Sequence, residues 1–556
     1  MLRSAFHDYE NLAKNRVIKS IFVEAEMKAS DIVVSCLENE DVEYVFGIIG
    51  KEVIDLGDSL SASEKITYIP VRHEQGAAFM ADVYGRISGK PGVCLATLGP
   101  GAANLLTGIA SANLDHSPVI TLTGQKGLDQ QHKNAHQYID IQKVYEPVTK
   151  WSIQIKAANT IPEIIRRSFR MAIEEKPGAV VIELPENIAA ENVITKPLAV
   201  TRLPKSVPAF EEFKVAAQVL NKSVRPFIIV GNGVIRQDAV LEVQSFIEQL
   251  GSPIVTSFMA KGILPKDHLQ NFYTFGFMEK DYVLRGFEEA DLLIVIGFDM
   301  VEKLPSEWNK KKVPVIHIAG TAADVDEYYP VLAELVGNLK ETLPLFLTNN
   351  LKAKPWQPSG GLKSRIEESY SIIEKASTDS TLTIETLLHV LERVQTKQII
   401  VISDVGSHKV TIARTYQPKH AKQLIISNGF ASMGISIPGA IGAKLAAPEK
   451  TVICVTGDGG ALMNFSELET AKRLGLSFVI ILLNDSMLKL EVDTMEKKFG
   501  DSFGVTFTNP DFVQLAESYG ARGLKATNVE EFEAMLTEAM NSRGEIVLID
   551  TIVKSA

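Results

Sequence analysis

Short runs of β-branched and apolar residues alternate with helix-length amphipathic stretches from about residue 28 to the end of the chain. Most of these runs end in Gly or Pro, which is typical of strands that enter a turn. Strands that alternate with helices form parallel sheets with helices on both faces. The sequence therefore predicts an α/β protein built from doubly wound parallel sheets.

The predicted strands fall into three groups. They are 44–49, 66–71, 92–98, 118–123 and 179–184; then 227–230, 253–256, 292–296 and 315–318; then 398–403, 423–427, 451–455, 478–483 and 546–552. The stretches 196–208 and 349–361, with prolines or paired glycines, are the predicted linkers. We therefore expect an N-terminal extension and three domains, which cover 1–26, 27–195, 209–348 and 362–556.

The first and third groups share a weak internal echo. Residues 85–91, followed by a strand and a Gly-Pro-Gly turn, parallel residues 442–448, followed by a strand and a Gly-Asp-Gly turn. Two related domains that flank a third would explain this similarity. Chance likeness between two ordinary helix–strand–turn units is the alternative, and the sequence leaves both open.

The composition excludes several classes of protein. The chain has a formal charge of −11, so a general affinity for nucleic acid or anionic membranes is not expected. Its longest apolar runs fall far short of the roughly 20 residues that span a bilayer. Cys36, Cys94 and Cys454 lie far apart among apolar residues, which favours core positions over disulfides or a metal site. We expect a soluble globular protein without nucleic-acid or membrane partners.

The segment before Met27 lacks an apolar stretch of signal-peptide length and contains acidic as well as basic residues. We therefore expect a cytoplasmic protein with an unprocessed N terminus. The periodic sequence begins at residues 27–31, so translation from Met27 is the alternative. The sequence alone does not decide between the two starts.

The strongest chemical signal is a glycine-rich turn after a predicted apolar strand, followed one helix and one strand later by Asn484. The turn comprises Gly457, Asp458, Gly459 and Gly460. In a doubly wound sheet both turns lie at the carboxyl edge, where ligands bind. Glycines let backbone N–H groups approach a phosphate, and the oxygens of Asp458 and Asn484 suit Mg²⁺. The spacing predicts that both turns face one diphosphate ligand.

A second constellation places Glu74 between a predicted strand and the start of a predicted helix. The plain interpretation is an acid that complements the positive end of the helix dipole. The other interpretation is a proton-transfer group, which typically contributes 10² to 10⁴ in rate. The choice between them depends on the family that the chain resembles.

The pairing of a Gly-Asp-Gly turn with an asparagine after the next strand resembles the thiamine-diphosphate enzymes. Further motifs narrow the resemblance to the acetolactate synthases over about residues 27–554: Gly99-Pro100-Gly101-Ala102-Ala103-Asn104, Gly124-Gln125, His136-Gln137, Pro147-Val148-Thr149-Lys150-Trp151, Val405-Gly406-Ser407-His408, Asn428-Gly429-Phe430-Ala431-Ser432-Met433-Gly434 and Ala516-Glu517-Ser518-Tyr519-Gly520-Ala521. The variants at 136–137, 406–408 and 296–299 are more similar to the catabolic, FAD-independent branch than to the FAD-containing biosynthetic one.

The resemblance implies a role for each matched residue. Glu74 would hydrogen-bond the pyrimidine N1′ of thiamine diphosphate and favour the imino tautomer that activates the thiazolium C2. The other implied roles are a bent cofactor held by Met433, a diphosphate bound by Ser407 and His408, a substrate near Gln137, and Mg²⁺ bound by Asp458, Asn484 and the backbone carbonyl of Ser486. Taken singly, the plain interpretations are that Met433 is a core residue, His408 a loop residue with its hydrogen bonds satisfied, and Gln137 an exposed amide.

The resemblance also implies the reaction and the assembly. Pyruvate would be decarboxylated on the cofactor, and its hydroxyethyl unit would join a second 2-oxo acid to give 2-acetolactate, in a branched-chain amino acid or acetoin pathway. The pyrimidine-binding domain, 27–195, of one chain would meet the diphosphate-binding domain, 362–556, of another. We therefore expect a homodimer or homotetramer with active sites at the subunit interface, and no regulatory domain is visible in the sequence.

Two alternatives to this function stay open. One is a related thiamine-diphosphate decarboxylase or lyase that acts on another 2-oxo or acyl substrate. The other is a cofactor-binding but catalytically silent homologue. The silent homologue is motivated by a pair of departures from the family pattern: Ile49 stands where relatives have Pro, and residues 486–491 lack the usual Gly and aromatic residue. An aliphatic wall with Lys489 and Glu491 nearby would affect the preferred acceptor acid.

The middle group of strands contains one apparent nucleotide motif. Gly231-Asn232-Gly233 follows a predicted strand, but Arg236 replaces the third glycine of GxGxxG, so a dinucleotide redox role is not favoured. Trp308 is expected to pack the core of the middle domain.

Overall fold

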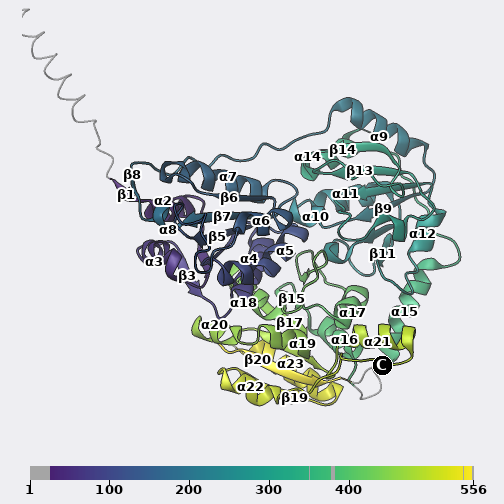
Figure 1. Cartoon of the computed structure of the whole chain (residues 1–556). Helices are drawn as coiled ribbons and strands as arrows, with labels where there is room; N and C mark the ends of the chain where they lie inside the picture. Colours follow the sequence, from purple (N-terminus) through teal and green to yellow (C-terminus); the bar gives the residue numbers. More distant parts are fainter. Residues whose placement is uncertain (1–25, 350, 377–381, 543, 554–556) are drawn as a thin grey trace, which may run out of the picture.

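The computed structural model describes residues 26–349, 351–376, 382–542 and 544–553, which form three α/β domains (Figure 1). Each domain is built on a parallel sheet of six strands, so the predicted fold class is confirmed. The N-terminal extension and the choice of start lie outside these residues, apart from position 26. Within them, no helix is long and apolar enough to cross a membrane.

The first sheet has the strand order β3-β2-β4-β5-β7-β6, and a separate antiparallel pair joins β1 to β8. Its elements are β1 (Met27–Lys28), α2 (Ala29–Asn39), β2 (Tyr44–Gly47), α3 (Ile54–Ser61), β3 (Thr67–Pro70), α4 (Glu74–Ser88), β4 (Gly92–Ala96), α5 (Pro100–Leu114), β5 (Val119–Gln125), α6 (Ile141–Tyr145), β6 (Trp151–Gln154), α7 (Ile161–Ile173), β7 (Ala179–Pro185), α8 (Glu186–Ala189) and β8 (Asn192–Val193).

The central sheet has the order β11-β10-β9-β12-β13-β14, which is the order typical of dinucleotide-binding folds. Its elements are α9 (Phe210–Lys222), β9 (Pro226–Val230), α10 (Gly233–Arg236), α11 (Val240–Leu250), β10 (Ile254–Thr256), β11 (Asn271–Thr274), α12 (Leu284–Glu289), β12 (Leu292–Ile296), α13 (Pro305–Trp308), β13 (Val315–Ala319), β14 (Val331–Val336) and α14 (Leu339–Thr348).

The last sheet has the order β16-β15-β17-β18-β20-β19. Its elements are α15 (Leu362–Ala376), α16 (Ile384–Val394), β15 (Ile399–Ser403), α17 (Ser407–Thr415), β16 (Leu424–Ile426), α18 (Ser436–Ala446), β17 (Thr451–Gly457), α19 (Asp458–Met463), α20 (Glu467–Arg473), β18 (Val479–Asn484), α21 (Lys489–Phe499), α22 (Phe512–Ser518), β19 (Arg522–Ala526), α23 (Val529–Asn541) and β20 (Val547–Ile552).

Counted within each domain, the first and last sheets share the strand order 2-1-3-4-6-5. The matching helices α4 and α18, which carry the internal echo, pack against each other (Figure 1). The two helices approach so closely at Gly442 that a Cβ there would lie 2.3 Å from the carbonyl oxygen of Met80. One hydrophobic core therefore includes side chains of both domains, among them Phe79, Val83 and Ile441.

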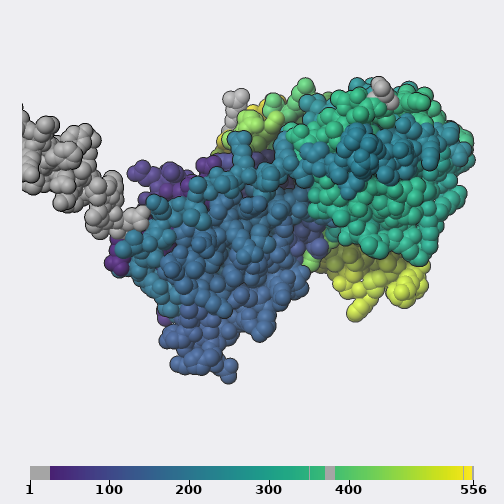
Figure 2. All heavy atoms as spheres, turned by 90° about the horizontal axis from the view of Figure 1, so that it is seen from above, coloured from purple at the N-terminus to yellow at the C-terminus, as the bar shows by residue number. Residues whose placement is uncertain are grey.

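The shared core belongs to the first and last domains, while the central domain has cores of its own. Seen from above, the blue first domain and the teal central domain lie side by side, and the yellow end of the chain emerges behind and below them (Figure 2). Residues 194–209 and 351–361 join the sheets and contain no helix or strand. These segments overlap both predicted linkers.

Every predicted strand is present, with ends that differ by at most two residues. Six strands of the described residues were not predicted: the two-residue strands β1 and β8, and the edge strands β6, β11, β14 and β19 of the larger sheets. Strands β6, β14 and β19 are partly exposed and mix polar with apolar residues, while β11 has only four residues. Edge positions therefore weaken the apolar signal on which strand prediction depends.

The expected core residues are confirmed. Cys36, Cys94 and Cys454 are buried free thiols, and Trp308 is buried in the central domain. The indole of Trp308 packs edge-on against Phe275, Phe287 and Phe298.

Candidate active site

The carboxyl edge of the last sheet brings two side-chain oxygens together. β17 ends at Gly457 and the neighbouring β18 ends at Asn484. One amide nitrogen, Nδ2 of Asn509, lies 2.7 Å from Asp458 Oδ2 and 2.8 Å from Asn484 Oδ1. The two turns therefore converge, as their spacing in the sequence predicted.

Backbone donors fix the orientation of the Asp458 carboxylate. Oδ2 accepts hydrogen bonds from the backbone N–H groups of Asp485 at 3.2 Å and Ser486 at 2.7 Å. Oδ1 accepts one from Gly459 at 2.7 Å, and the residue is only 2% exposed. Asp458 is thus a rigid acceptor at the end of β17.

The oxygens at this edge suit Mg²⁺, which prefers carboxylate, amide and carbonyl ligands. Ser486 has a φ of 61°, and its carbonyl accepts a hydrogen bond from the N–H of Phe507 at 3.0 Å, which leaves a second lone pair. Across the described residues, no group of three or more His, Cys, Asp or Glu side chains could hold a metal. A cation here would depend on neutral oxygens as well as on Asp458.

Three apolar side chains cover the glycine-rich turn. A Cβ at Gly459 would lie 3.4 Å from Met433 Cε, 3.4 Å from Leu488 Cδ2 and 3.5 Å from Phe507 Cζ. The half-buried Met433 therefore stands beside the turn, and its role in holding the cofactor stays a prediction. Leu488 forms the expected aliphatic wall, but Phe507 adds an aromatic ring that the sequence analysis missed.

His408 has unused hydrogen-bonding capacity next to the same turn. Its ring lies beside Gly457, since a Cβ there would be 3.5 Å from Cε1. Nε2 is buried and has no hydrogen-bond partner within the described part of the chain. Burial lowers the pKa of His408, so the ring is neutral at neutral pH. Because buried polar atoms are normally paired, this nitrogen fits a ligand-binding edge. Ser407 precedes it at the start of α17.

The first domain holds Glu74 at the first residue of α4, after β3. Glu74 is 7% exposed, and its Oε2 accepts a hydrogen bond from Asn104 Nδ2 at 3.0 Å. Oε1 faces Gly101, where a Cβ would lie 3.2 Å away. The carboxyl group is therefore held at one oxygen, while the other faces a residue without a side chain.

The last domain supports the start of this helix. Glu467 of α20 is fully buried, and its Oε1 accepts hydrogen bonds from the backbone N–H groups of Arg72 and His73, each at 3.0 Å. Asn464 adds a contact of 3.4 Å to the side chain of Gln75. The residues on either side of Glu74 are thus anchored across the domain boundary.

Gln137 lies at the same edge of the first domain. Its carbonyl oxygen would be 2.4 Å from a Cβ at Gly99, so it packs directly on the turn that leads to Gly101. Its φ is 62° and the residue is exposed. Gln137 therefore lies at the surface beside this turn, and its contact with substrate stays a prediction.

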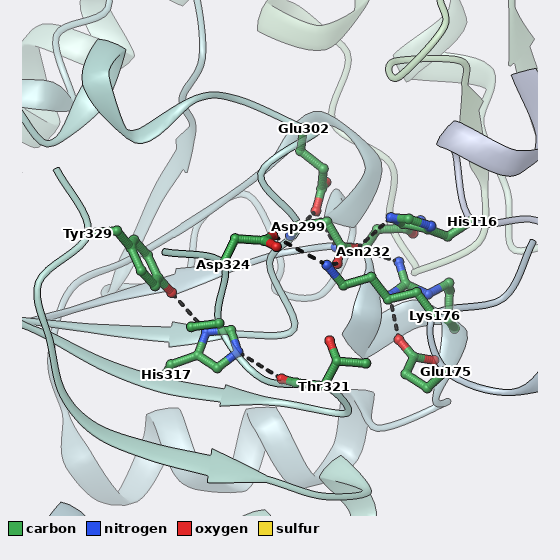
Figure 3. Close-up of polar contacts among 12 residues, drawn as sticks. His116, Glu175, Lys176, Asn232, Asp299, Glu302, His317, Thr321, Asp324 and Tyr329 are labelled. Atoms are coloured by element: carbon green, nitrogen blue, oxygen red, sulfur yellow. Dashed lines mark hydrogen bonds and ion pairs between the residues drawn. The ribbon is translucent and has the colours of Figure 1, made fainter. Parts of the chain in front are cut away.

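The crevice of the central sheet is filled by a carboxylate of the chain itself. Glu302 Oε1 accepts hydrogen bonds from the backbone N–H groups of Asn232 at 3.0 Å and Asp299 at 3.3 Å (Figure 3). These amides follow β9 and β12, at the switch point where dinucleotide phosphates bind in such folds. Ser257 donates to Oε2, and burial together with Asp299 raises the pKa of Glu302 to about 7.

A charged cluster closes the same crevice. Arg236 Nη1 lies 2.7 Å from Asp299 Oδ2. Lys176 Nζ lies 3.2 Å from Asp299 Oδ1 (Figure 3). Burial lowers the pKa of His116 to about 4, so its ring is neutral beside Asp299 at neutral pH. Burial alone would raise the pKa of Asp299, but Arg236 and the other cations outweigh it and lower the pKa to about 2.

A cavity of about 520 Å³ opens where the three domains meet. Arg86, His116, Arg236, Met259 and Ile426 are among its lining residues. Asp458 and Asn484 are not among the lining residues, so this cavity is separate from the place where their oxygens converge.

Sequence reasoning missed the residues that support the predicted ones. Asn509 and Asp550 contact Asn484, while Asn104 and Glu467 hold Glu74 or its helix. The Asn509-Pro510 dipeptide indicates a turn but not its proximity to Asp458. Asn104 stood inside a recognised motif, which was the only signal for its position.

Family profiles match most of the chain. The thiamine pyrophosphate enzyme N-terminal TPP binding domain matches residues 27–144, the central domain matches 213–345, and the C-terminal TPP binding domain matches 404–551. These matches follow the three sheets in order.

Curated relatives are similar along nearly the whole chain. An acetolactate synthase of Bacillus subtilis is 31% identical, with 98% of this chain and 95% of that protein aligned. An acetolactate synthase large subunit of Haemophilus influenzae is 32% identical over 94% of both chains. A catabolic acetolactate synthase of Raoultella terrigena is 33% identical over 93% of this chain and 94% of that one.

Proposed function

Since this chain belongs to the acetolactate synthase family of thiamine pyrophosphate enzymes, we propose that it decarboxylates pyruvate and joins the remaining two-carbon unit to a second 2-oxo acid. With pyruvate as the acceptor, the reaction gives 2-acetolactate and CO₂. Carbon balances, because two three-carbon acids become one five-carbon acid and CO₂.

The observation that carries this proposal is the convergence of Asp458 and Asn484 at one sheet edge, in a chain that also buries Glu74 at a helix start. The edge of the last sheet offers a cation and diphosphate site, and Glu74 in the first domain offers a proton-exchanging acid. A thiamine-diphosphate carboligase needs both.

Thiamine diphosphate, when bound, supplies the carbon nucleophile and the electron sink for decarboxylation. Glu74 would exchange a proton with the pyrimidine ring of the cofactor. We assign this exchange to Oε1, because Asn104 holds Oε2 and Gly101 leaves Oε1 uncovered. Such a group contributes about 3 to 5 kcal/mol to lowering the barrier.

The last domain would bind the diphosphate and Mg²⁺. Asp458, Asn484 and the Ser486 carbonyl are the proposed cation ligands, and Ser407 with His408 Nε2 would contact the diphosphate. The backbone of the glycine-rich turn would lie against the phosphates, because Gly457, Gly459 and Gly460 carry no side chains. Met433 would support the bent cofactor, and Gln137 would face the substrate.

We propose that the reaction runs without FAD. The support is Glu302, whose carboxylate occupies the backbone amides of Asn232 and Asp299. A dinucleotide phosphate would have to displace this carboxyl group from the two backbone amides at the switch point of the central sheet. Purified protein should release no flavin on denaturation, and added FAD should leave the rate of acetolactate formation unchanged; stoichiometric flavin would contradict this proposal.

We propose a homodimer, alone or within a homotetramer, in which Glu74 of one copy faces Asp458 and Asn484 of a second copy. Large apolar side chains are exposed near both edges, among them Ile49 at 40%, Leu462 at 41% and Met463 at 54%. Exposed apolar residues of this size commonly mark an interface. Sedimentation should give a dimer or tetramer, and activity should fall on dilution; a fully active monomer would contradict the shared site.

The experiment for the main proposal incubates the protein with pyruvate, Mg²⁺ and thiamine diphosphate and follows both CO₂ and acetolactate. We expect both products, and we expect the formation of both to fall by about 10²- to 10⁴-fold with Glu74→Gln. CO₂ without acetolactate would indicate a decarboxylase instead. Neither product from a folded protein would move the assignment to another substrate or to a silent homologue.

A further inference from the structure

Asn509 spans the two oxygens at the edge of the last sheet. Its Nδ2 donates to Asp458 Oδ2 at 2.7 Å and to Asn484 Oδ1 at 2.8 Å. A primary amide has two N–H bonds, so each oxygen can receive one. A single side chain therefore sets how the Asp458 carboxylate and the Asn484 amide lie relative to each other.

Asp550 fixes the Asn484 amide from its other end. Asn484 Nδ2 donates to Asp550 Oδ1 at 2.9 Å, and Asp550 is 4% exposed on β20. An asparagine amide can present either its oxygen or its NH₂ group to a ligand, and only the oxygen binds a cation. With Asp550 accepting at one end and Asn509 donating at the other, the oxygen of Asn484 is directed toward Asp458.

A purely structural role for Asn509 would be the anchoring of the turn at Pro510. Such an anchor normally satisfies both ends of the amide. Here Oδ1 of Asn509 is buried without a partner in the described residues, while Nδ2 contacts both oxygens. The amide is therefore placed for donation to the two proposed ligands.

We propose that Asn509 and Asp550 are positioning residues that orient the cation ligands, an inference that rests on the proposed Mg²⁺ role of Asp458 and Asn484. Neither residue binds the cation itself. Partners of metal ligands typically contribute 10- to 100-fold in metal affinity. Loss of either contact should therefore weaken cation binding by about that factor.

The test measures Mn²⁺ affinity by electron paramagnetic resonance of free Mn²⁺, with thiamine diphosphate present and pyruvate absent. Asn509→Leu and Asp550→Leu should each raise the Kd by about 10- to 100-fold. Asp550→Asn keeps an acceptor oxygen for Asn484 and should stay within about threefold of the unmodified protein. The matched control is Asn528→Ala, which removes the cap of α23 and should leave the Mn²⁺ Kd unchanged.

A melting curve without cation shows whether each variant folds. If Asn509→Leu folds and its Mn²⁺ Kd stays within twofold of the unmodified protein, the inference is wrong for Asn509. If Asn509→Leu does not fold, the two Asp550 variants decide, and equal Kd values for Leu and Asn would overturn the inference. Excess Mg²⁺ should restore turnover in the positioning variants, which lost folding would not allow.

The same measurements separate this inference from the proposed function. The proposed function alone would be contradicted if the unmodified protein binds Mn²⁺ but forms no acetolactate, while Asn509→Leu weakens its Mn²⁺ affinity. Unmodified protein that binds no Mn²⁺ would overturn the inference.

Discussion

The first and last sheets have the same strand order but present different chemistry at their carboxyl edges. A carboxylate occupies the same register position in both sheets: Glu183 pairs with Thr123 in the first sheet, and Asp550 pairs with Leu482 in the last. Two residues after these strand positions stand Gln125 and Asn484, whose NH₂ groups donate to Glu183 and Asp550 respectively. The same amide–acid pair thus occurs twice in the chain.

The use of the amide oxygen distinguishes the two edges. Gln125 Oε1 accepts a hydrogen bond from the N–H of Lys126 at 2.9 Å, whereas Asn484 Oδ1 points toward Asp458 and Asn509. Leu98, fully buried, lies at the register position that Asp458 occupies in the last sheet. The partner of the amide oxygen and the residue at the Asp458 position therefore distinguish the closed edge of the first sheet from the oxygen-lined edge of the last sheet. The shared fold alone does not determine the chemistry.

The largest expected effect separates the jobs of the two domains. Glu74→Gln should lower acetolactate formation by about 10²- to 10⁴-fold, because the amide cannot exchange a proton as the carboxyl does. Its Mn²⁺ affinity should stay unchanged, since the proposed cation ligands lie in the last domain. Steady-state assays and Mn²⁺ titration check both statements, and a variant that keeps more than a tenth of the rate would contradict the first.

Asp458→Asn should break the oxygen-lined edge. The substitution keeps the volume but removes the charge, so the Mn²⁺ Kd should rise by more than about 100-fold, beyond the loss typical of outer partners. Glu183→Gln, at the matching edge of the first sheet, is the control and should leave the Kd unchanged. Equal losses in both variants would mean that the two edges do not differ in function.

The buried acid of the first edge should make stability depend on pH. Burial raises the pKa of Glu183 from its ordinary value of 4.5 to about 7, although hydrogen bonds from Gln125 and other amides oppose the shift. The folded chain then holds a proton that the unfolded chain loses, so stability falls as pH rises between these values, by about 3 kcal/mol at most. Relative to the unmodified protein, the melting temperature of Glu183→Gln should rise as the pH is raised from about 5 to 8. A flat or opposite trend would contradict a buried, protonated Glu183.

The smallest expected effect concerns the wall of the oxygen-lined edge. Leu488 lies beside Met433 at the glycine-rich turn, and Leu488→Phe would narrow the space next to it. We expect the preference for pyruvate over 2-oxobutanoate as acceptor to change by about tenfold, within the range that one methylene commonly provides. Competition between the two acids, followed by product analysis, measures the ratio. Leu488→Ile keeps the volume and should leave it nearly unchanged.

The central strands of each sheet could be predicted because burial on both faces requires continuous apolar runs. Leu292–Ile296 was predicted to its ends for this reason. The edge strand Val331–Val336 could not be recognised, since its partly exposed face admits polar residues. Strand order depends on which strands pair, whereas the sequence pattern reports single strands, so the match between the first and last sheets was visible only as a weak echo.

The site could be predicted in part for a related reason. Asp458 and Asn484 end neighbouring strands, so sequence spacing alone places them together. Asn509 reaches the same point from a loop that folds back after α21, and no periodicity reports such a contact. The role of Glu74 rested on resemblance, because a glutamate at a helix start is common.

Glu467 makes the first domain dependent on the last. Its buried carboxylate accepts the backbone N–H groups of Arg72 and His73, immediately before Glu74. A fragment that ends before the last domain would leave these two donors without that acceptor, and the turn that aims Glu74 would lose its brace. The domains are therefore not interchangeable modules. Transplanting the first domain into another protein would carry Glu74 along but not the Glu467 contact that orients its turn.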